Sequence, residues 1–545
     1  MKITFVSCAI EMDNLSFPLG LLSIKAALLK SGEFTDEEVS ILLYDLSSDP
    51  VEAAKSLSKL PVDCFGLSIY LWNRAWFDSF VKTLRSLKKD VIIFAGGTEV
   101  SANYSSFSFD EYNYLIAGEG EESDTALLIA LKHNTIVDSV GVMSREKPEF
   151  SYASVADLST LSSPFLTGIA TPFIKEGCTV LWEMTRGCPF QCAFCFESKG
   201  LRGVRHYPFE RVEQELDYLV AMDVKDVFVL DPTFNIDKDR TKKILTRIIE
   251  TVPEDMHFTF ELRAELLDEE LASMFASFNC SLQIGLQSIH QSVLETVNRT
   301  FKKSVFTSKM KLLNKYQVTF GLDLIIGLPK DTLSLFKESL DYAVSCTPSN
   351  IDIFLLTMLP GTVVRQKAES YGMEYLEDAP YSTLSTPTFS KEDLAKALKL
   401  KDAADLLYTK GASCMWINKL CEALEATPCE VFELFSSFMD YLESKHRDCY
   451  KEDIFDLEDE FVAKAIRNLG KEEYAEVLTN YIELHQALVC LTDTGEEVEV
   501  MLNYNPNALS DLDHTSLDTF MATHSGHQAK QFTLFYDEDG NVNFD

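Results

Sequence analysis

The sequence lacks any hydrophobic run long enough to cross a membrane. Its longest apolar stretches, such as VIIFAGG (residues 91–97) and GLDLIIGLP (residues 321–329), are far shorter than the ~20 residues of a membrane helix. The N-terminus, MKITFVSCAI, has neither the apolar centre nor the small-residue cleavage site of a secretory signal. We therefore expect a cytoplasmic protein with no membrane partner.

Basic residues are scarce relative to acidic ones. The 545 residues contain 49 Lys and Arg against 85 Asp and Glu, which gives a net charge of −36. Such a surface favours solubility and repels phosphate backbones. The charge thus argues against a nucleic acid as the main partner without naming another.

Cysteine is too sparse for a disulfide scaffold. The 13 cysteines are an odd number, and Cys8, Cys64 and Cys280 lie inside apolar segments where buried reduced thiols are common. The Gly-x-Gly-x-x-Gly fingerprint is also absent after the first apolar segment, which counts against NAD or flavin.

Residues 1–135 alternate between strand and helix patterns, which predicts a flavodoxin-like, doubly wound parallel sheet of the α/β class. Strands are expected at residues 2–8, 39–47, 64–72, 91–97 and 112–120. Sheets of this kind bind ligands at the carboxyl ends of their strands. Those ends carry Ser68, Ile69, Tyr70, Leu71, Trp72 and Asn73, then Gly96 and Gly97, and then Gly118, Glu119, Gly120 and Glu121.

The rest of the chain divides into three parts. Residues 136–175 are rich in Ser and Pro and are predicted to be a linker. Residues 176–370 show six strand patterns separated by helices, which predicts a partial, TIM-like (βα)6 barrel. Residues 371–545 are predicted to form a mainly α-helical domain with a short β tail. We expect core packing for its stripe of Val431, Leu434, Phe435 and Phe438, and a hairpin turned at Asp539 and Gly540.

Three cysteines stand together in RGCPFQCAFCF (residues 186–196), directly after the first predicted barrel strand. Thiolates bind zinc, copper(I) or iron–sulfur clusters. Structural zinc requires four ligands, and Cys178 and His206 are near enough in sequence to keep zinc as an alternative. A four-iron cluster held by Cys188, Cys192 and Cys195 would leave one iron open to a small molecule, which explains three ligands rather than four.

The stretch EMTRGCPFQCAFCFES closely resembles the cluster loop of radical S-adenosylmethionine (SAM) enzymes. The resemblance implies a [4Fe-4S] cluster on Cys188, Cys192 and Cys195, with SAM bound at the open iron and Phe194 against its adenine. It also implies that the reduced cluster cleaves SAM to a 5′-deoxyadenosyl radical, so the difficult chemistry belongs to the cofactors.

Later segments resemble the strand ends at which this family binds SAM. Asp231 falls near the amino-group segment, although the usual Gly-Gly-Glu is missing, and Leu328 and Pro329 match a later strand end. The other SAM contacts that the resemblance implies are Glu261, Arg263, Gln283 and Gln287. Alternatively, Glu261 and Arg263 form an exposed charged pair.

The segments PLGLLSIKAALLKSG, GLSIYLWN, AGGTEV and IAGEGEES resemble the cobalamin-binding domain that precedes the barrel in one large radical SAM class. The cobalamin contacts that the resemblance implies are Ser68, Tyr70, Leu71, Trp72, Asn73, Gly96, Gly97, Glu99, Gly118, Glu119 and Gly120. The Asp-x-His-x-x-Gly motif is absent: the only histidine before residue 200 is His133, with Leu131 at the Asp position. The resemblance therefore places Tyr70, Leu71 or Trp72 beneath the corrin. Alternatives are that Tyr70, Trp72 and Trp76 pack against neighbouring elements, or that the sheet binds no cobalamin.

The two resemblances together imply a methyltransferase that methylates an unactivated carbon through the 5′-deoxyadenosyl radical and methylcobalamin. They also imply a small-molecule or peptide substrate and a reducing electron donor, flavodoxin or ferredoxin. One alternative is a rearrangement, cyclisation or epimerisation with the same cofactors. A remote alternative is a sensor whose C-terminal helices bind a partner protein.

Overall fold

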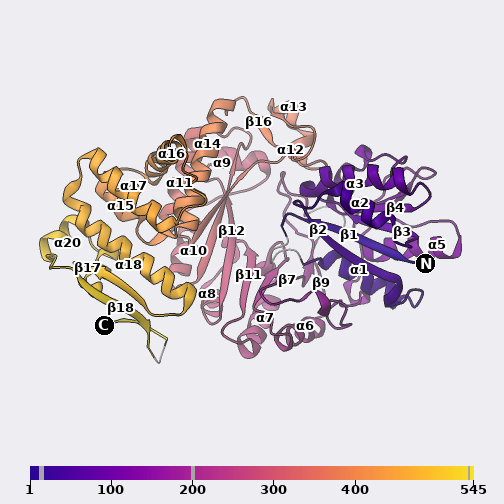
Figure 1. Cartoon of the computed structure of the whole chain (residues 1–545), viewed down its shortest axis with the longest axis horizontal. Helices are drawn as coiled ribbons and strands as arrows, with labels where there is room; N and C mark the ends of the chain where they lie inside the picture. Colours follow the sequence, from indigo (N-terminus) through magenta and orange to yellow (C-terminus); the bar gives the residue numbers. More distant parts are fainter. Residues whose placement is uncertain (12–16, 198–202, 538–539) are drawn as a thin grey trace.

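The computed structural model describes residues 1–11, 17–197, 203–537 and 540–545. Figure 1 shows three parts in a row: an N-terminal α/β sheet, a central barrel-like sheet and a helical region that ends in a small β-sheet. Over the described ranges, no helix is both long and apolar enough to span a membrane.

The N-terminal part is the expected doubly wound sheet. Its strands lie in the order β2-β1-β3-β4-β5-β6, and β1 to β5 are parallel. Two apolar cores lie on its opposite faces, one around Phe77 and Phe80 and the other around Leu21 and Leu128. The strands are β1 (Ile3–Ala9), β2 (Val39–Asp45), β3 (Cys64–Ser68), β4 (Ile92–Gly96), β5 (Tyr114–Ile116) and β6 (Val142–Ser144). The helices are α1 (Leu19–Lys30), α2 (Pro50–Ser58), α3 (Arg74–Leu87), α4 (Thr98–Asn103) and α5 (Gly120–His133).

Two details of this sheet differ from the prediction. Strand β3 ends at Ser68 rather than at Trp72, because the Asn73 side chain accepts a hydrogen bond from Tyr70 N and donates to Cys8 O, which turns the chain. The predicted linker also contributes β6, which pairs antiparallel with β5. Three residues are too few to show a periodicity.

The central part confirms the partial barrel of six parallel strands. They lie in sequence order, β7-β10-β11-β12-β13-β14, with β7 and β14 at the two edges. The strands are β7 (Thr179–Trp182), β10 (Asp226–Val229), β11 (His257–Leu262), β12 (Cys280–Gln287), β13 (Thr319–Ile326) and β14 (Asn350–Leu355), with a short pair β8 (Thr185–Arg186) and β9 (Arg205–His206). The helices are α6 (Phe209–Ala221), α7 (Lys238–Thr251), α8 (Glu269–Phe275), α9 (Gln291–Leu294), α10 (Lys303–Lys315) and α11 (Leu333–Ser345).

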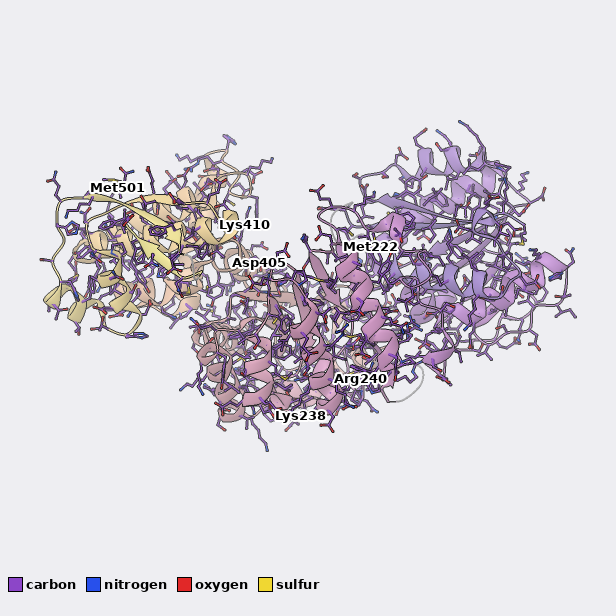
Figure 2. All side chains as sticks on the ribbon, turned by 90° about the horizontal axis from the view of Figure 1, so that it is seen from below. Met222, Lys238, Arg240, Asp405, Lys410 and Met501 are labelled. Atoms are coloured by element: carbon purple, nitrogen blue, oxygen red, sulfur yellow. The ribbon has the colours of Figure 1, made fainter. Side chains whose placement is uncertain are left out.

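The C-terminal part is helical with a β tail, as expected. Val431, Phe435 and Phe438 are buried, and the core that they join is continuous with the barrel core. A π-helical segment, Asp405–Lys410, continues α14 at the junction with the barrel (Figure 2). The predicted hairpin corresponds to β18 and β19, although Asp539 of its turn lies outside the described residues.

The helices of this part are α12 (Val363–Gln366), α13 (Ala368–Tyr371), α14 (Lys391–Ala404), α15 (Ile417–Leu424), α16 (Pro428–Ser444), α17 (Ile454–Leu469), α18 (Ala475–Thr494), α19 (Pro506–Leu509) and α20 (Leu517–Thr523). The strands are β15 (Glu374–Tyr375), β16 (Thr383–Ser385), β17 (Val498–Leu502), β18 (Lys530–Tyr536) and β19 (Val542–Phe544).

Candidate active site

The cysteine loop leaves the carboxyl end of β7 through the short strand β8. Cys188, Cys192 and Cys195 are all half-buried, and Cys195 N donates to Cys192 O over 3.1 Å, which closes a turn. Burial raises the pKa of the Cys195 thiol to about 12, and the neighbouring Cys192 and Cys188 add to the rise. Bringing several thiolates together therefore needs a metal to compensate their charge.

The three thiols of Cys188, Cys192 and Cys195 fit a cluster that takes three thiolate ligands. In the described chain no three Cys, His, Asp or Glu side chains are already gathered around one point as metal ligands. Cys178 lies at the opposite end of β7, where its thiol contacts the carbonyls of Phe173 and Thr179. The zinc alternative thus loses the nearest cysteine as its fourth ligand.

Two neighbouring segments, around Val297 and around Val364, hold the loop in place. Ala193 N donates to Val297 O, and Val364 N donates to Ala193 O, each over 2.9 Å. Asn298 Nδ2 donates to Gln191 O over 2.8 Å. Such backbone ties fix a loop without using its thiols. Phe194 is half-buried against an apolar cluster from the later barrel strands rather than free in solvent.

Two arginines add to this support. The Arg263 guanidinium lies 3.9 Å from the centre of the Phe190 ring, inside the cysteine loop. Arg299 donates to Gly285 O over 2.7 Å, and burial lowers its pKa while the adjacent Cys192 opposes that shift. Sequence reasoning missed Arg299, because nothing in the spacing of residue 299 links it to the cysteines.

Asp231 is buried and has a structural task. Its Oδ1 accepts from Met184 N and Thr185 N over 2.8 and 2.9 Å, so it anchors the chain just before the cysteine loop. Burial raises the pKa of Asp231 to about 7. The carboxyl contacts the backbone that positions the loop, and the SAM contact expected for Asp231 stays a prediction.

The other predicted SAM residues lie in or just after β11 and β12, with Gln283 near the middle of β12. Gln283 donates to the carboxylates of Asp323 and Asp352, and burial raises the pKa of Asp323 to about 6. The Glu261 side chain is exposed to solvent. The protein atoms around it still remove part of the hydration of its carboxylate, and this desolvation raises its pKa to about 7. Arg263 does not pair with Glu261 but with Glu265, over 2.6 Å.

Gln287 departs most from ordinary backbone and hydrogen-bonding rules. It ends β12 with φ +66°, and its Oε1 is buried without a partner among the described residues. Buried amide oxygens are rarely left unsatisfied in a protein. Among the predicted SAM residues, Gln287 therefore has a side-chain oxygen that is free to accept a hydrogen bond from a ligand.

A cavity lies between the N-terminal sheet and the barrel, with about 1260 Å³ of empty volume, open solvent included. The cysteine-loop side contributes Gly187, Phe196 and Glu197 to its wall. The predicted cobalamin residues that line it are Ser68, Tyr70, Gly96, Gly97, Gly118, Glu119 and Gly120. Six lining residues are glycines, so a large ligand could approach backbone closely over much of this wall.

Four predicted cobalamin residues are not part of that wall. Leu71 and Trp72 lie in the turn after β3, where Trp72 stacks on Tyr70 with ring centres 4.5 Å apart. Asn73 is buried against backbone carbonyls, and Glu99 accepts a hydrogen bond from the Tyr381 hydroxyl. Trp76 packs in the core of the sheet, which bears out the packing interpretation for that residue.

Gly97 and Gly118 are required by the protein's own backbone. A Cβ at Gly97 would lie 2.3 Å from Ile69 O, and one at Gly118 would lie 2.1 Å from Ala153 O. Both have positive φ, +106° and +96°. The sequence reasoning attributed these glycines to a close cofactor contact, whereas chain packing already explains them.

An ion-pair network crosses the cavity wall between the two sheets. Arg205 binds Glu119 over 2.6 Å, and Arg186 binds Glu121 over 2.6 Å and Glu183 over 2.9 Å. Burial raises the pKa of Glu119, but the two arginines and Val155 N–H outweigh it and hold the pKa below its usual value. Because Arg186 precedes Gly187 and Cys188, the network connects the N-terminal sheet directly to the cysteine loop.

Comparisons with known families assign both sheets. Residues 182–343 match the radical SAM superfamily, and residues 8–128 match the B12 binding domain. The chain combines a radical SAM domain with a B12 binding domain. These domains imply a [4Fe-4S] cluster with SAM, and cobalamin, respectively. Residues 369–487 of this radical SAM protein match a family of unknown function, DUF4080.

Two relatives of this chain are named as methyltransferases. The cobalamin-dependent radical SAM methyltransferase TokK of Streptomyces tokunonensis is 25% identical over 394 residues, 66% of this chain and 57% of TokK. The 2-(S-pantetheinyl)-carbapenam-3-carboxylate methyltransferase of Streptantibioticus cattleyicolor is 31% identical over 195 residues, 32% of this chain and 28% of that protein. The chain thus spans less than two thirds of either relative's length.

The fold has counterparts among solved structures. The cobalamin-dependent SAM radical enzyme OxsB with aqua-cobalamin bound superposes with a TM-score of 0.59 at 15% identity, covering 87% of this chain and 81% of OxsB. The α/β architecture predicted from the sequence, with two different sheets followed by helices, is confirmed.

Proposed function

We propose that this radical SAM protein is a cobalamin-dependent methyltransferase that methylates an unactivated carbon of a small-molecule substrate. The shared cavity carries the proposal. Its wall combines the carboxyl ends of β3, β4 and β5 with the residues that lead into and out of the cysteine loop. A cobalamin held by the sheet and a cluster held by the loop would therefore adjoin the same space, where a substrate could meet both.

The chain's own residues would position these groups. Cys188, Cys192 and Cys195 would hold the cluster, while Arg263, Glu261, Gln283 and Gln287 would contact SAM. Ser68, Tyr70, Gly97, Gly118 and Gly120 would line the cobalamin face, with Tyr70 the candidate beneath the corrin. When bound, the cluster with SAM supplies a radical and cobalamin carries the methyl group.

The protein supplies orientation and water exclusion. Arg186 and Arg205 neutralise the carboxylates of Glu119, Glu121 and Glu183 at the cavity wall, so these charges are held in fixed ion pairs. Fixed charges in a partly enclosed cavity position reactants without reorganisation during the reaction.

The relatives support a small-molecule substrate. One of them is named for a carbapenam carboxylate, and both are named as methyltransferases. Radical chemistry of this type also needs an electron for the cluster, and we propose an acidic carrier, flavodoxin or ferredoxin, as its source.

Metal loading tests the two-cofactor proposal. Anaerobic reconstitution with iron, sulfide and hydroxocobalamin is expected to give roughly four irons and one cobalt per chain after desalting. Cys192→Ala should lose the iron and keep the cobalt, whereas the control Cys178→Ala should keep both. Iron without cobalt would refute the assignment of the N-terminal sheet, and zinc in place of both would refute the whole proposal.

Product analysis tests the reaction. Under reducing conditions the loaded protein should form 5′-deoxyadenosine and S-adenosylhomocysteine from SAM, in step with methylated product. Formation of 5′-deoxyadenosine with a substrate that gains no methyl group would contradict methyl transfer.

A further inference from the structure

One segment of this acidic chain carries only positive charge. Residues 296–322 contain Arg299, five lysines and no Asp or Glu, although acids make up 85 of the 545 residues. The lysines are Lys302, Lys303, Lys309, Lys311 and Lys315. A run of 27 residues without a single acid is unusual in such a sequence, and the segment has a defined place in the fold.

The segment begins at the cysteine loop. Val297 O accepts from Ala193 N, and the Asn298 side chain donates to Gln191 O. Lys302 follows Arg299 by three residues, so their Cα atoms lie at most ~11 Å apart. The cysteine loop itself reaches solvent here, because Pro189 and Gln191 are exposed.

Three of these lysines have no ion-pair partner in the part of the chain that the structure describes. Lys302, Lys303 and Lys311 are exposed, whereas Lys315 is paired with Glu269 over 2.6 Å and Lys309 donates to Leu267 O. Glu265, which lines the same pocket as Lys302, is already paired with Arg263. Lys303 Nζ lies 4.9 Å from the centre of the Tyr342 ring, and both lysine side chains remain exposed to solvent.

The position of Lys302 and Lys303 costs helix stability. They occupy the N-cap and first position of α10, and the first turn of that helix contains no acid. Cations at a helix N-terminus oppose the helix dipole and so destabilise the helix. Apart from the contact of Lys303 with the Tyr342 ring, these two lysines make no stabilising contact that explains their place among the described residues, and the dipole adds to the positive potential that they create.

We propose that Lys302, Lys303 and Lys311 form the docking surface for a small acidic one-electron carrier protein. The proposal rests on the proposed function, which requires an electron at the cluster. One electron leaves the reduced carrier, which is oxidised, and enters the cluster, which is reduced. Because the whole chain has a net charge of −36, most of its surface repels an acidic carrier, and a cationic surface beside the cysteine loop orients it.

Charge reversal tests the docking surface on the loaded full-length protein. Reduced flavodoxin and reduced ferredoxin serve as separate probes, and dithionite serves as a reductant that needs no docking. In the double variant Lys302→Glu/Lys303→Glu, the second-order rate of cluster reduction by either carrier at low ionic strength should fall about tenfold or more. The salt dependence of that rate should flatten, while reduction by dithionite stays as in the wild type.

A matched control separates local from global charge. Lys82→Glu/Lys89→Glu changes the net charge equally, with two exposed lysines that have no ion-pair partner among the described residues. It should leave reduction by the carriers within about twofold of wild type, since the change lies on the distant N-terminal sheet. Equal losses in both double variants would overturn the proposal, because they would show only an effect of net charge.

Three other outcomes would also overturn the docking proposal. Reduction of the wild type by dithionite but by neither carrier would overturn the docking surface and leave the proposed function standing. Loss of product formation in Lys302→Glu/Lys303→Glu with dithionite as reductant would assign these lysines to substrate binding and overturn docking. Failure of the wild type to load a cluster would refute the proposed function, and this inference with it.

Discussion

At the scale of single residues, Asp231 shows how a buried carboxyl supports a loop of cysteines. It satisfies the backbone N–H groups of Met184 and Thr185. Asp231→Leu should leave both donors unsatisfied, at ~1–3 kcal/mol each, and should reduce iron loading together with stability. Asp231→Asn keeps an acceptor oxygen and should load iron nearly as the wild type does. Urea unfolding and iron analysis of both variants measure this, and equal iron loading by the two variants would contradict the anchoring role.

Gly118 offers a second test at this scale. Gly118→Ala combines a positive φ with a Cβ 2.1 Å from Ala153 O, so the loop before α5 must move. We expect a loss of about 2–4 kcal/mol in unfolding free energy and weaker cobalamin binding, measured by urea unfolding and by cobalt retention. Gly32→Ala is the matched control, because Gly32 has φ +73° with nothing within 4 Å of the new Cβ. Its cost should be limited to backbone strain, about 1 kcal/mol, with cobalt retention unchanged.

At the scale of elements, a buried carboxyl lies beside the π-helical segment that joins the C-terminal helices to the barrel. Glu458 of α17 is fully buried, accepts from Gln486 over 2.9 Å and lies against Gly411, just beyond that segment. Burial raises the pKa of Glu458 from 4.5 to about 9. The folded state thus favours the neutral acid, so its contribution to stability is fully present below pH ~4.5 and is lost as the pH rises toward 9.

Glu458→Gln should remove this pH dependence. We expect the variant to gain stability relative to the wild type between pH 5 and 9, by up to ~1.4 kcal/mol per pH unit, and to match it near pH 4.5. Thermal unfolding at several pH values measures the difference. The exposed Glu472→Gln serves as control and should follow the wild type throughout. A stability difference for Glu458→Gln that does not change with pH would show that Glu458 is not neutral in the fold.

Some of the helices and strands could be predicted from the sequence alone, and others could not. Long periodic segments such as α3 and the apolar strands of the barrel carry their own hydrophobic pattern, so they were predictable. The early end of β3 depends on Asn73 reaching Cys8 O, and β6 depends on pairing with β5. Both are decided by contacts between distant residues, which no local pattern contains.

The residues of the candidate site were likewise predictable only in part. The three cysteines were predictable because their spacing and their place after a strand are local. Arg299 and the network of Arg186 with Glu119 and Glu121 were not, because Cys192, Glu119 and Glu121 lie more than 60 residues along the chain from the arginines that they meet. At Gly97 and Gly118 the packed backbone requires glycine, which no local pattern shows, and the cofactor contact expected there stays a prediction.

At the scale of the whole molecule, the apolar cores separate the N-terminal sheet from the barrel but join the barrel to the C-terminal helices. The N-terminal sheet has two cores of its own, whereas one continuous core runs through the barrel and the C-terminal helices. The two bodies meet through ion pairs at the cavity and through α1 residues such as Leu22 that reach the barrel core. The C-terminal helices are thus part of the barrel's stability, while the cobalamin-binding sheet can unfold with its own cores.

This division predicts two transitions in calorimetry of the apoprotein. Hydroxocobalamin should raise only the transition of the N-terminal sheet, by ~2.7 kcal/mol of stabilisation at a hundredfold excess over its Kd, because a ligand stabilises the body that binds it. Hydrogen exchange at residues 64–96 should slow in parallel, while exchange in α16 and α17 stays constant. A single transition whose midpoint rises with hydroxocobalamin would contradict this prediction. It would mean that the ion pairs of Arg186 and Arg205 make the two bodies unfold together in spite of their separate cores.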